Sequence, residues 1–182
     1  ECRYTEMKPI WYQVPSVSER TDRIMEILQQ ARGGVSIGIL FRHREQLTQE
    51  ANRLRQRGIH LQIALSGRDY QYSFENVSIP TLTTTHSAKG IEFDWVFLPD
   101  LDADYWDAER HDPKQRRLFF VAVTRTKNRL YLVSQTDRSC AYLHEIVDKA
   151  PNLLQVPSQA FQRTDTTRMS DFDDDDGNDL PF

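Results

Sequence analysis

Two segments of the chain concentrate residue types that bind phosphate groups. The first segment, residues 79–101, contains a run of threonines followed by a histidine, a serine, a lysine and a glycine, at Thr83, Thr84, Thr85, His86, Ser87, Lys89 and Gly90. Hydroxyl groups and exposed backbone N–H groups are common ligands of phosphate. The composition of this segment alone is explained equally well by a threonine-rich edge strand that leads into a solvated turn.

The second segment, residues 115–133, places five positive charges within fourteen residues, at Arg116, Arg117, Arg125, Lys127 and Arg129. The spacing of its apolar residues predicts a helix over residues 115–126, so Arg125 lies where the helix gives way to the next strand. A planar guanidinium held there suits a phosphate or a transferring phosphoryl group. Taken alone, a solvated basic helix end is the simpler interpretation, because cations are favoured there in any case.

The elements that would position these segments alternate between strands and helices. Apolar runs predict strands at residues 3–14, 35–41, 59–65, 77–86, 95–101 and 129–135. Helical spacing and capping residues, among them Ser16 with Glu19, predict helices at residues 16–32, 45–57, 115–126 and 139–149. This alternation implies β–α–β crossovers and a mostly parallel sheet with helices on both faces. In such a sheet, ligands bind at the carboxyl ends of the strands.

Composition divides the chain into a folded part and a tail. Of the 182 residues, 38% are apolar, which is enough for one core. We expect a folded domain at residues 1–157 and a disordered acidic tail at residues 158–182. The tail contains seven Asp and two Arg, whereas the rest contains 21 basic and 20 acidic residues, so the net charge of −4 arises in the tail. The overall charge therefore does not decide whether the folded part binds nucleic acid.

Three further features bear on the compartment. The apolar runs are far shorter than the roughly 20 residues that span a bilayer, which argues against an integral membrane protein. The two cysteines, Cys2 and Cys140, lack the spacing of a disulfide framework or a zinc site and favour a reducing compartment. The chain begins at Glu1 without a signal segment, so we expect a piece of a longer protein of the bacterial cytoplasm or nucleoid.

Taken together and in this order, the two segments resemble motifs V and VI of the UvrD/Rep-like superfamily 1 DNA helicases. The first motif, roughly T-x-H-x-x-K-G-x-E-F-x-x-V-F, is matched by Thr84, His86, Lys89, Gly90, Glu92, Phe93, Val96 and Phe97. The second, roughly R-R-L-x-Y-V-A-x-T-R-A, is matched by Arg116, Arg117, Leu118, Phe120, Val121, Ala122, Thr124 and Arg125. Residues 39–59 are similar to motif IVa, so the resemblance covers about residues 35–135.

The resemblance implies a RecA-like α/β fold and the role of a second motor domain. In this family ATP with Mg²⁺ lies between two such domains, and single-stranded DNA crosses both. Arg125 would be the catalytic arginine finger that stabilises charge on the γ-phosphoryl group. Nucleotide contacts would come from Gly90, Glu92 and Arg117. DNA contacts would come from Arg42, Arg44, Thr84, His86, Ser87 and Lys89. A purely structural histidine stays an alternative for His86, as does interdomain pairing for Arg116 and Arg117.

The chain also departs from the family pattern. It contains no GxxxxGK[ST] phosphate loop, so the N-terminal motor domain of the same protein would hold most of the ATP and its Mg²⁺. Gln115, Arg44 and Thr126 stand where the family usually has Glu, Asn and Ala. We therefore expect half of an ATP-dependent DNA helicase or translocase, inactive without that partner domain. A degenerate domain kept only for structure is a further alternative.

The end of the chain supports a second hypothesis. Residues 169–182 are acidic and resemble the C-terminal tip of bacterial single-stranded-DNA-binding proteins. A terminal aromatic can enter an apolar pocket while acidic residues meet its basic rim, so this tip would bind proteins that bind such tails. The residues concerned are Asp179, Leu180, Pro181 and Phe182. Simple solubilising disorder explains the acidic composition equally well.

Overall fold

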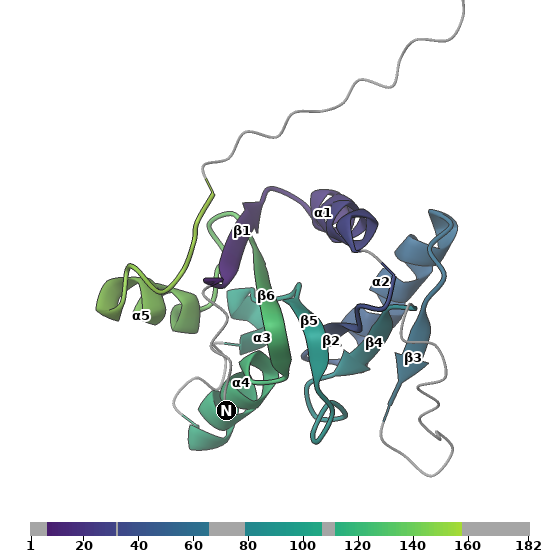
Figure 1. The fold of residues 1–182 in the computed structure, drawn as a ribbon. Coiled ribbons are helices and arrows are strands. Elements are labelled where there is room, and N and C mark those ends of the chain that lie inside the picture. Colours follow the sequence, from purple (N-terminus) through teal and green to yellow (C-terminus); the bar gives the residue numbers. More distant parts are fainter. Residues whose placement is uncertain (1–6, 32, 66–78, 107–111, 158–182) are drawn as a thin grey trace, which may run out of the picture.

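The structure is a computed structural model that describes residues 7–31, 33–65, 79–106 and 112–157. One sheet of six strands, all of them parallel, runs through the domain in the order β1-β6-β5-β2-β4-β3 (Figure 1). The strands are β1 (Ile10–Val14), β2 (Ile37–Phe41), β3 (Gln62–Ala64), β4 (Thr81–Thr84), β5 (Phe93–Leu98) and β6 (Thr126–Gln135). The parallel sheet predicted from the alternating pattern is confirmed.

Helices cover both faces of the sheet. They are α1 (Val17–Gln30), α2 (Arg44–Gln56), α3 (Ala103–Trp106), α4 (Pro113–Val123) and α5 (Ala141–Lys149). One apolar cluster joins α1 and α2 to one face of the sheet, and a second joins α3, α4 and α5 to the other face. Within the described ranges, no helix combines the length and apolar composition that crossing a membrane requires.

Local signals explain most helix boundaries. The Ser16 side chain accepts a hydrogen bond from the backbone N–H of Glu19 at 3.2 Å, which confirms the predicted cap of α1. The predicted start of α4 at Gln115 is two residues late, because Asp112 caps the helix and Pro113 forms its first turn. The predicted end is late as well, because Thr126 already pairs with Phe93 in the sheet.

The first strand is shorter than predicted. The expected strand began at residue 3, whereas β1 starts at Ile10, directly after Pro9. Proline has no backbone N–H to donate to a neighbouring strand, so it ends the pairing of β1 with β6 at this point. Residues 3–6 lie outside the described part of the chain.

The connection between β4 and β5 decides where the candidate site residues lie. Thr84, the last residue of β4, pairs with Phe41 at the carboxyl edge of the sheet. Phe93, the first residue of β5, pairs with Thr126 at the opposite, amino-terminal edge. Residues 85–92, which we call the crossing segment, therefore run from one edge of the sheet to the other. His86 lies near the first edge and Glu92 near the second.

Phe93 also fixes how closely β5 approaches β2. A Cβ atom added at Gly38 would lie 2.4 Å from the Phe93 ring, so only glycine fits at this point of β2. Phe93 is 2% exposed and anchors the end of the crossing segment in the core. The edge that carries Glu92 and Arg125 is therefore built on tightly packed structure.

Candidate functional site

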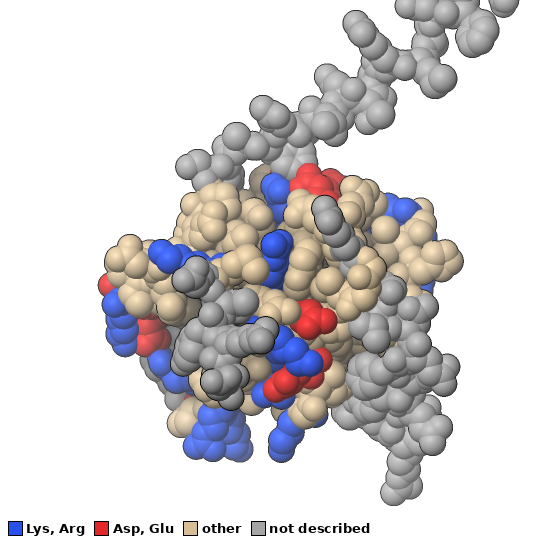
Figure 2. Space-filling view, viewed as in Figure 1, with Lys and Arg blue, Asp and Glu red and all other residues tan. Residues whose placement is uncertain are grey.

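A basic groove lies between α4 and the crossing segment. Its volume is about 420 Å³, and its lining residues are Arg42, Thr85, His86, Lys89, Asp112, Lys114, Gln115, Arg117, Leu118 and Val121. Two lysines and two arginines face one carboxylate, and none of these four cations forms an ion pair with an acidic side chain of the described residues. Figure 2 shows Lys and Arg side chains along the lower part of this face, around α4. We call this feature the basic groove.

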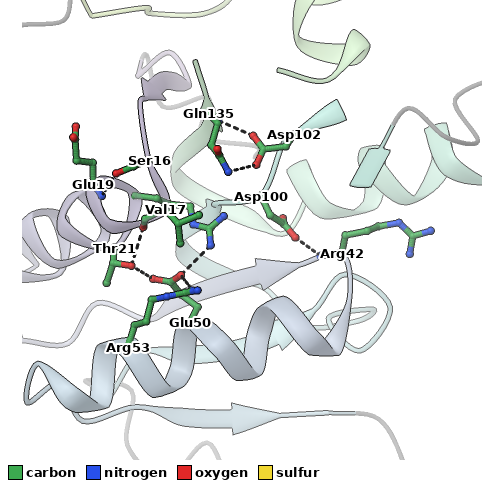
Figure 3. Close-up of polar contacts among 11 residues, drawn as sticks. Ser16, Val17, Glu19, Thr21, Arg42, Glu50, Arg53, Asp100, Asp102 and Gln135 are labelled. Carbon is green, nitrogen blue, oxygen red and sulfur yellow. Dashed lines mark hydrogen bonds and ion pairs between the residues drawn. The ribbon is translucent and has the colours of Figure 1, made fainter. Parts of the chain in front are cut away.

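Arg42 follows β2 and is held by neutral groups. Its Nη2 donates to Oε1 of Gln115 at 2.9 Å, and its Cζ lies 5.8 Å from the ring centre of Trp106. Its backbone N–H donates to Oδ2 of Asp100 at 3.0 Å (Figure 3). The side chain is thus oriented by a neutral amide and an aromatic ring, which leaves its positive charge available to an anion.

The first turn of the crossing segment exposes two of the predicted DNA ligands. His86 and Lys89 are exposed, and both line the basic groove. Gly90 follows with a φ of +86°, a conformation that residues with a side chain rarely adopt. A Cβ at Gly90 would meet nothing within 4 Å, so the backbone conformation accounts for this glycine in the isolated chain.

Thr84 and Ser87 do not face the groove in the same way. Thr84 is 7% exposed and Ser87 is 5% exposed, and the two hydroxyl groups lie 2.9 Å apart in a hydrogen bond. The backbone N–H of Ser87 also donates to the Thr84 hydroxyl at 3.2 Å. These hydroxyls stabilise the turn that presents His86. Their direct contact with DNA stays a prediction, and their burial does not favour it.

Arg125 and Glu92 lie together at the amino-terminal edge of the sheet. The backbone N–H of Phe93, next to Glu92, donates to the carbonyl oxygen of Arg125 at 2.9 Å. The Nε of Arg125 donates to the carbonyl oxygen of Val121 at 3.1 Å, and its Nη2 donates to the Thr124 hydroxyl at 3.4 Å. Among the described residues, no carboxylate pairs with this guanidinium, and Glu92 is exposed. We call this region the Arg125 corner.

The adjacent arginines of α4 have different surroundings. Arg116 binds Glu145 of α5 through both terminal nitrogens, at 2.6 Å and 3.2 Å, and hydrogen bonds from Arg116 and Lys149 hold the pKa of Glu145 down at about 2. Arg117 instead lines the basic groove. The pairing of Arg116 is therefore within this domain. The predicted contact of Arg117 with nucleotide stays a prediction, because Arg117 lies with His86 and Lys89 and not at the Arg125 corner.

Two buried aspartates support the carboxyl edge from below. Asp100 accepts the backbone N–H that follows β2, and Oδ1 of Asp102 accepts the backbone N–H of Gln135 in β6 at 2.6 Å (Figure 3). The segment after β5 thus ties the ends of both neighbouring strands. Burial raises the pKa of Asp100 to about 6 and also raises the pKa of Asp102. Arg20, which pairs with Glu50 at 3.1 Å, offsets part of this effect by its positive charge.

Other predicted site residues lie elsewhere. Arg44 is exposed in the first turn of α2 and does not line the basic groove. The four residues predicted to bind partners, Asp179, Leu180, Pro181 and Phe182, lie outside the described residues. The roles of all of them stay predictions.

Asp112, Lys114 and Gln115 also line the groove, although the sequence did not indicate them as ligands. Lys114 had a usable signal, because the spacing of Lys114, Arg117 and Val121 places them on one helical face. No sequence signal indicated that Asp100 and Trp106 contact Arg42, because these contacts arise from tertiary packing.

Comparisons with known proteins identify relatives for most of the folded part. Residues 15–137 match the family profile described as the UvrD-like helicase C-terminal domain. DNA helicase II of Rickettsia typhi is 33% identical over 98 residues, which cover 48% of this chain and 15% of that protein. The ATP-dependent DNA helicase srs2 of Schizosaccharomyces pombe is 32% identical over 121 residues, 65% of this chain and 13% of that protein. The chain thus spans a small part of the length of these relatives.

Solved structures share the fold. The C-terminal domain of a possible DNA helicase from Lactobacillus plantarum has a TM-score of 0.64 at 17% identity, covering 84% of this chain and 86% of that chain. The C-terminal domain of the DEAD-box protein Dbp5 has a TM-score of 0.59 at 15% identity, covering 82% and 89%. At such identities the likeness shows the fold alone, and it confirms the predicted RecA-like class.

Proposed function

Because the chain belongs to the UvrD-like helicase C-terminal domain family, we propose that it is the second motor domain of an ATP-dependent DNA helicase or translocase. The observation that carries the proposal is the separation of the basic groove from the Arg125 corner by the eight residues of the crossing segment. The basic groove presents several cations that could bind a polyanion. The Arg125 corner presents one guanidinium, and the exposed Glu92 lies at the same edge of the sheet. A motor needs both kinds of site and a link between them.

The basic groove would bind the backbone of single-stranded DNA. Arg42, His86 and Lys89 line it without neutralising partners among the described acidic residues. Cations that contact phosphates release counterions, so binding of this kind weakens as salt increases. We expect the chain to bind single-stranded DNA weakly and with a clear salt dependence. Arg44 would add a phosphate contact from the start of α2.

The Arg125 corner would face ATP held by the N-terminal motor domain. Arg125 would act as the arginine finger, while the exposed Glu92 and the backbone at Gly90 would approach the nucleotide. Arg117 lines the basic groove and stays a separate candidate for nucleotide contact. A guanidinium whose Nε is already tied to Val121 is oriented before the nucleotide arrives. We assign Mg²⁺, like most of the ATP, to the N-terminal motor domain, because a phosphate loop of the type GxxxxGK[ST] would hold both. ATP hydrolysis would supply the energy for movement along DNA.

An exposed aromatic side chain supports a domain interface at this corner. Phe120 lies on α4 one turn before Thr124, whose hydroxyl donates to the Phe120 carbonyl at 2.9 Å, and it is 65% exposed. A domain docked at the Arg125 corner would remove this apolar side chain from water, which is favourable. We assign this surface to the N-terminal motor domain of the same protein.

The test is the ATPase activity of the complete two-domain protein. We expect DNA-stimulated ATP hydrolysis that Arg125→Ala abolishes, while Arg116→Ala, which removes an arginine already paired with Glu145, retains it. Full activity of Arg125→Ala would overturn the proposal. An inactive complete protein with a folded C-terminal domain would instead favour a domain kept only for structure.

The acidic end of the chain supports a second candidate function, the recruitment of proteins that bind the tails of single-stranded-DNA-binding proteins. The supporting observation is the sequence of residues 169–182, which joins an acidic run to Leu180, Pro181 and Phe182. Deletion of residues 169–182 should abolish such binding in a pull-down, and unchanged affinity after the deletion would eliminate this function.

A further inference from the structure

Arg42 is the groove cation whose surroundings are most completely fixed. Its Nη2 donates to the amide oxygen of Gln115 at 2.9 Å, and its guanidinium lies over Trp106, which is 1% exposed. Its Nε is buried and has no hydrogen-bond partner among the described residues. The Arg42 guanidinium thus donates to a neutral acceptor through Nη2, while its Nε makes no hydrogen bond to the described residues.

Gln115 is placed by rigid structure. It is 8% exposed and lies in the first turn of α4, a helix whose N-terminus is capped by Asp112. Its amide oxygen accepts a hydrogen bond from Arg42, and the amide group carries no net charge. A glutamate of the same length would put a carboxylate at this point, and hydrogen bonds between charged partners are about twice as strong as neutral ones. Such a carboxylate would compete with any phosphate for Arg42.

We propose that Gln115 is a positioning residue that keeps the Arg42 guanidinium oriented, and not paired with a carboxylate, for a phosphate of single-stranded DNA. The inference rests on the proposed function of the basic groove, and it names a residue that determines the affinity of that groove. Asp100 does not neutralise Arg42 in the same way, because it binds the Arg42 backbone while the Arg42 side chain extends away from it (Figure 3).

Two substitutions of Gln115 separate the effect of an added charge from the effect of a lost orientation of Arg42. Gln115→Glu keeps the shape and the acceptor but adds a negative charge, whereas Gln115→Met keeps the length and the neutral charge but removes the acceptor. If Gln115 acts as we propose, the first variant loses a phosphate contact. The second keeps the contact and loses only the orientation of the guanidinium.

The experiment measures the binding of a fluorescent oligo-dT strand to the complete 182-residue chain across a salt titration. Gln115→Glu should weaken binding about five- to tenfold at low salt and should reduce the salt slope by about 0.7, the value of one single-strand phosphate contact. Gln115→Met should weaken binding about two- to threefold and leave the slope unchanged. Gln30→Glu adds the same charge at an exposed position of α1, on the opposite face of the sheet, and should change little.

A double-variant cycle distinguishes failure of this inference from failure of the proposed function. In an Arg42→Ala background, Gln115→Glu should have much less effect than in the unchanged chain, because the two residues act through one contact. If Arg42→Ala weakens binding but Gln115→Glu does not, the inference is wrong and the groove still binds DNA. If neither the unchanged chain nor Arg42→Ala shows salt-dependent binding, the proposed function of the groove is wrong. Thermal unfolding of each variant shows whether it is folded.

Discussion

The two ends of the crossing segment differ in how much of a site each one contains. At the carboxyl edge, the basic groove is lined on two sides, and Arg42 is oriented by Gln115 and Trp106 within the same domain. At the amino-terminal edge, Arg125 is oriented by Val121 and Thr124 and does not line the basic groove. In the proposed motor, the first end would bind its ligand with residues of this chain, whereas the second would present one group to a partner domain.

This difference indicates how the work of the proposed motor is divided. A surface that only grips a flexible polyanion can be built from one domain. A site that stabilises charge during phosphoryl transfer needs donors from several directions, and one guanidinium supplies only one of them. The predictions below test the separate roles of the two ends and then the packing that supports each of them, beginning with the largest expected effect.

The strongest test replaces Arg125 and Arg42 with alanine, one at a time. In the complete two-domain protein, Arg125→Ala should lower the ATPase rate by about a thousandfold while DNA binding is retained, because an arginine finger contributes only as charge develops on the phosphoryl group. Arg42→Ala should weaken DNA binding and leave ATP hydrolysis without DNA unchanged. Steady-state ATPase and fluorescence anisotropy report the two effects. Loss of both properties in either variant would contradict the separation of the two ends.

A second test removes the buried ion pair beneath the carboxyl edge. Glu50, which is fully buried, accepts from Arg20 at 3.1 Å and from the Thr21 hydroxyl at 2.6 Å (Figure 3). Glu50→Ala should lower the free energy of unfolding by about 3 to 5 kcal/mol, because it leaves the Arg20 charge buried and unpaired. Urea denaturation measures this loss. The control is Glu26→Ala, which removes a more exposed pair with Arg23 and should cost about 0.5 kcal/mol or less.

The third test uses the pH dependence of stability at Asp100. Burial raises its pKa in the folded protein to about 6, from 3.8. Its contribution to stability is therefore fully present below pH 3.8 and is lost as pH rises through 6, by about 2 to 3 kcal/mol in total. Asp100→Asn keeps an acceptor for the Arg42 N–H but does not titrate, so its stability relative to the unchanged chain should increase between these pH values. Equal pH profiles of the two proteins would refute this expectation.

The smallest effect is expected at the other end of β5. Burial acts to raise the pKa of Asp94, but hydrogen bonds from the backbone and hydroxyl of Ser36, at 2.9 Å and 2.7 Å, outweigh it and lower the pKa below 3.8. Asp94 therefore stabilises the fold above pH 3.8, and this contribution is lost as pH falls below that value. Asp94→Ala should cost about 1 kcal/mol at neutral pH. Chemical denaturation at pH 7 and pH 3 should show the cost shrinking in acid, opposite to the trend at Asp100.

Local patterns predicted the elements well because the relevant forces are local. The cap formed by Ser16 and the alternation of strands and helices both follow from neighbouring residues. The family resemblance then selected a region in which His86 and Lys89 do lie together. Spacing alone could not give the start of α4, since the cap at Asp112 lies before the periodic residues.

What could not be predicted depends on the direction of side chains and on contacts between distant segments. Thr84 and Ser87 share a motif with His86, but their hydroxyls are buried and hydrogen-bonded to each other, whereas the His86 side chain is exposed. His86 and Glu92 are close in sequence but lie toward opposite edges of the sheet. The contact of Arg42 with Gln115 joins residues 73 positions apart, so no local pattern contains it.

The compactness of the crossing segment has a mechanical consequence. The backbone N–H of Ala88 donates to the carbonyl oxygen of Thr84 at the end of β4 at 2.9 Å, the backbone N–H of Ile91 donates to the carbonyl oxygen of Ala88 at 3.0 Å, and Ala88 is fully buried. We expect a segment held by such hydrogen bonds and by a buried side chain to move as one rigid unit. In the motor that we propose, force on a DNA strand bound near His86 would therefore displace Glu92 at the other end of the crossing segment. Each cycle of nucleotide hydrolysis at the Arg125 corner would in turn displace the end that binds DNA.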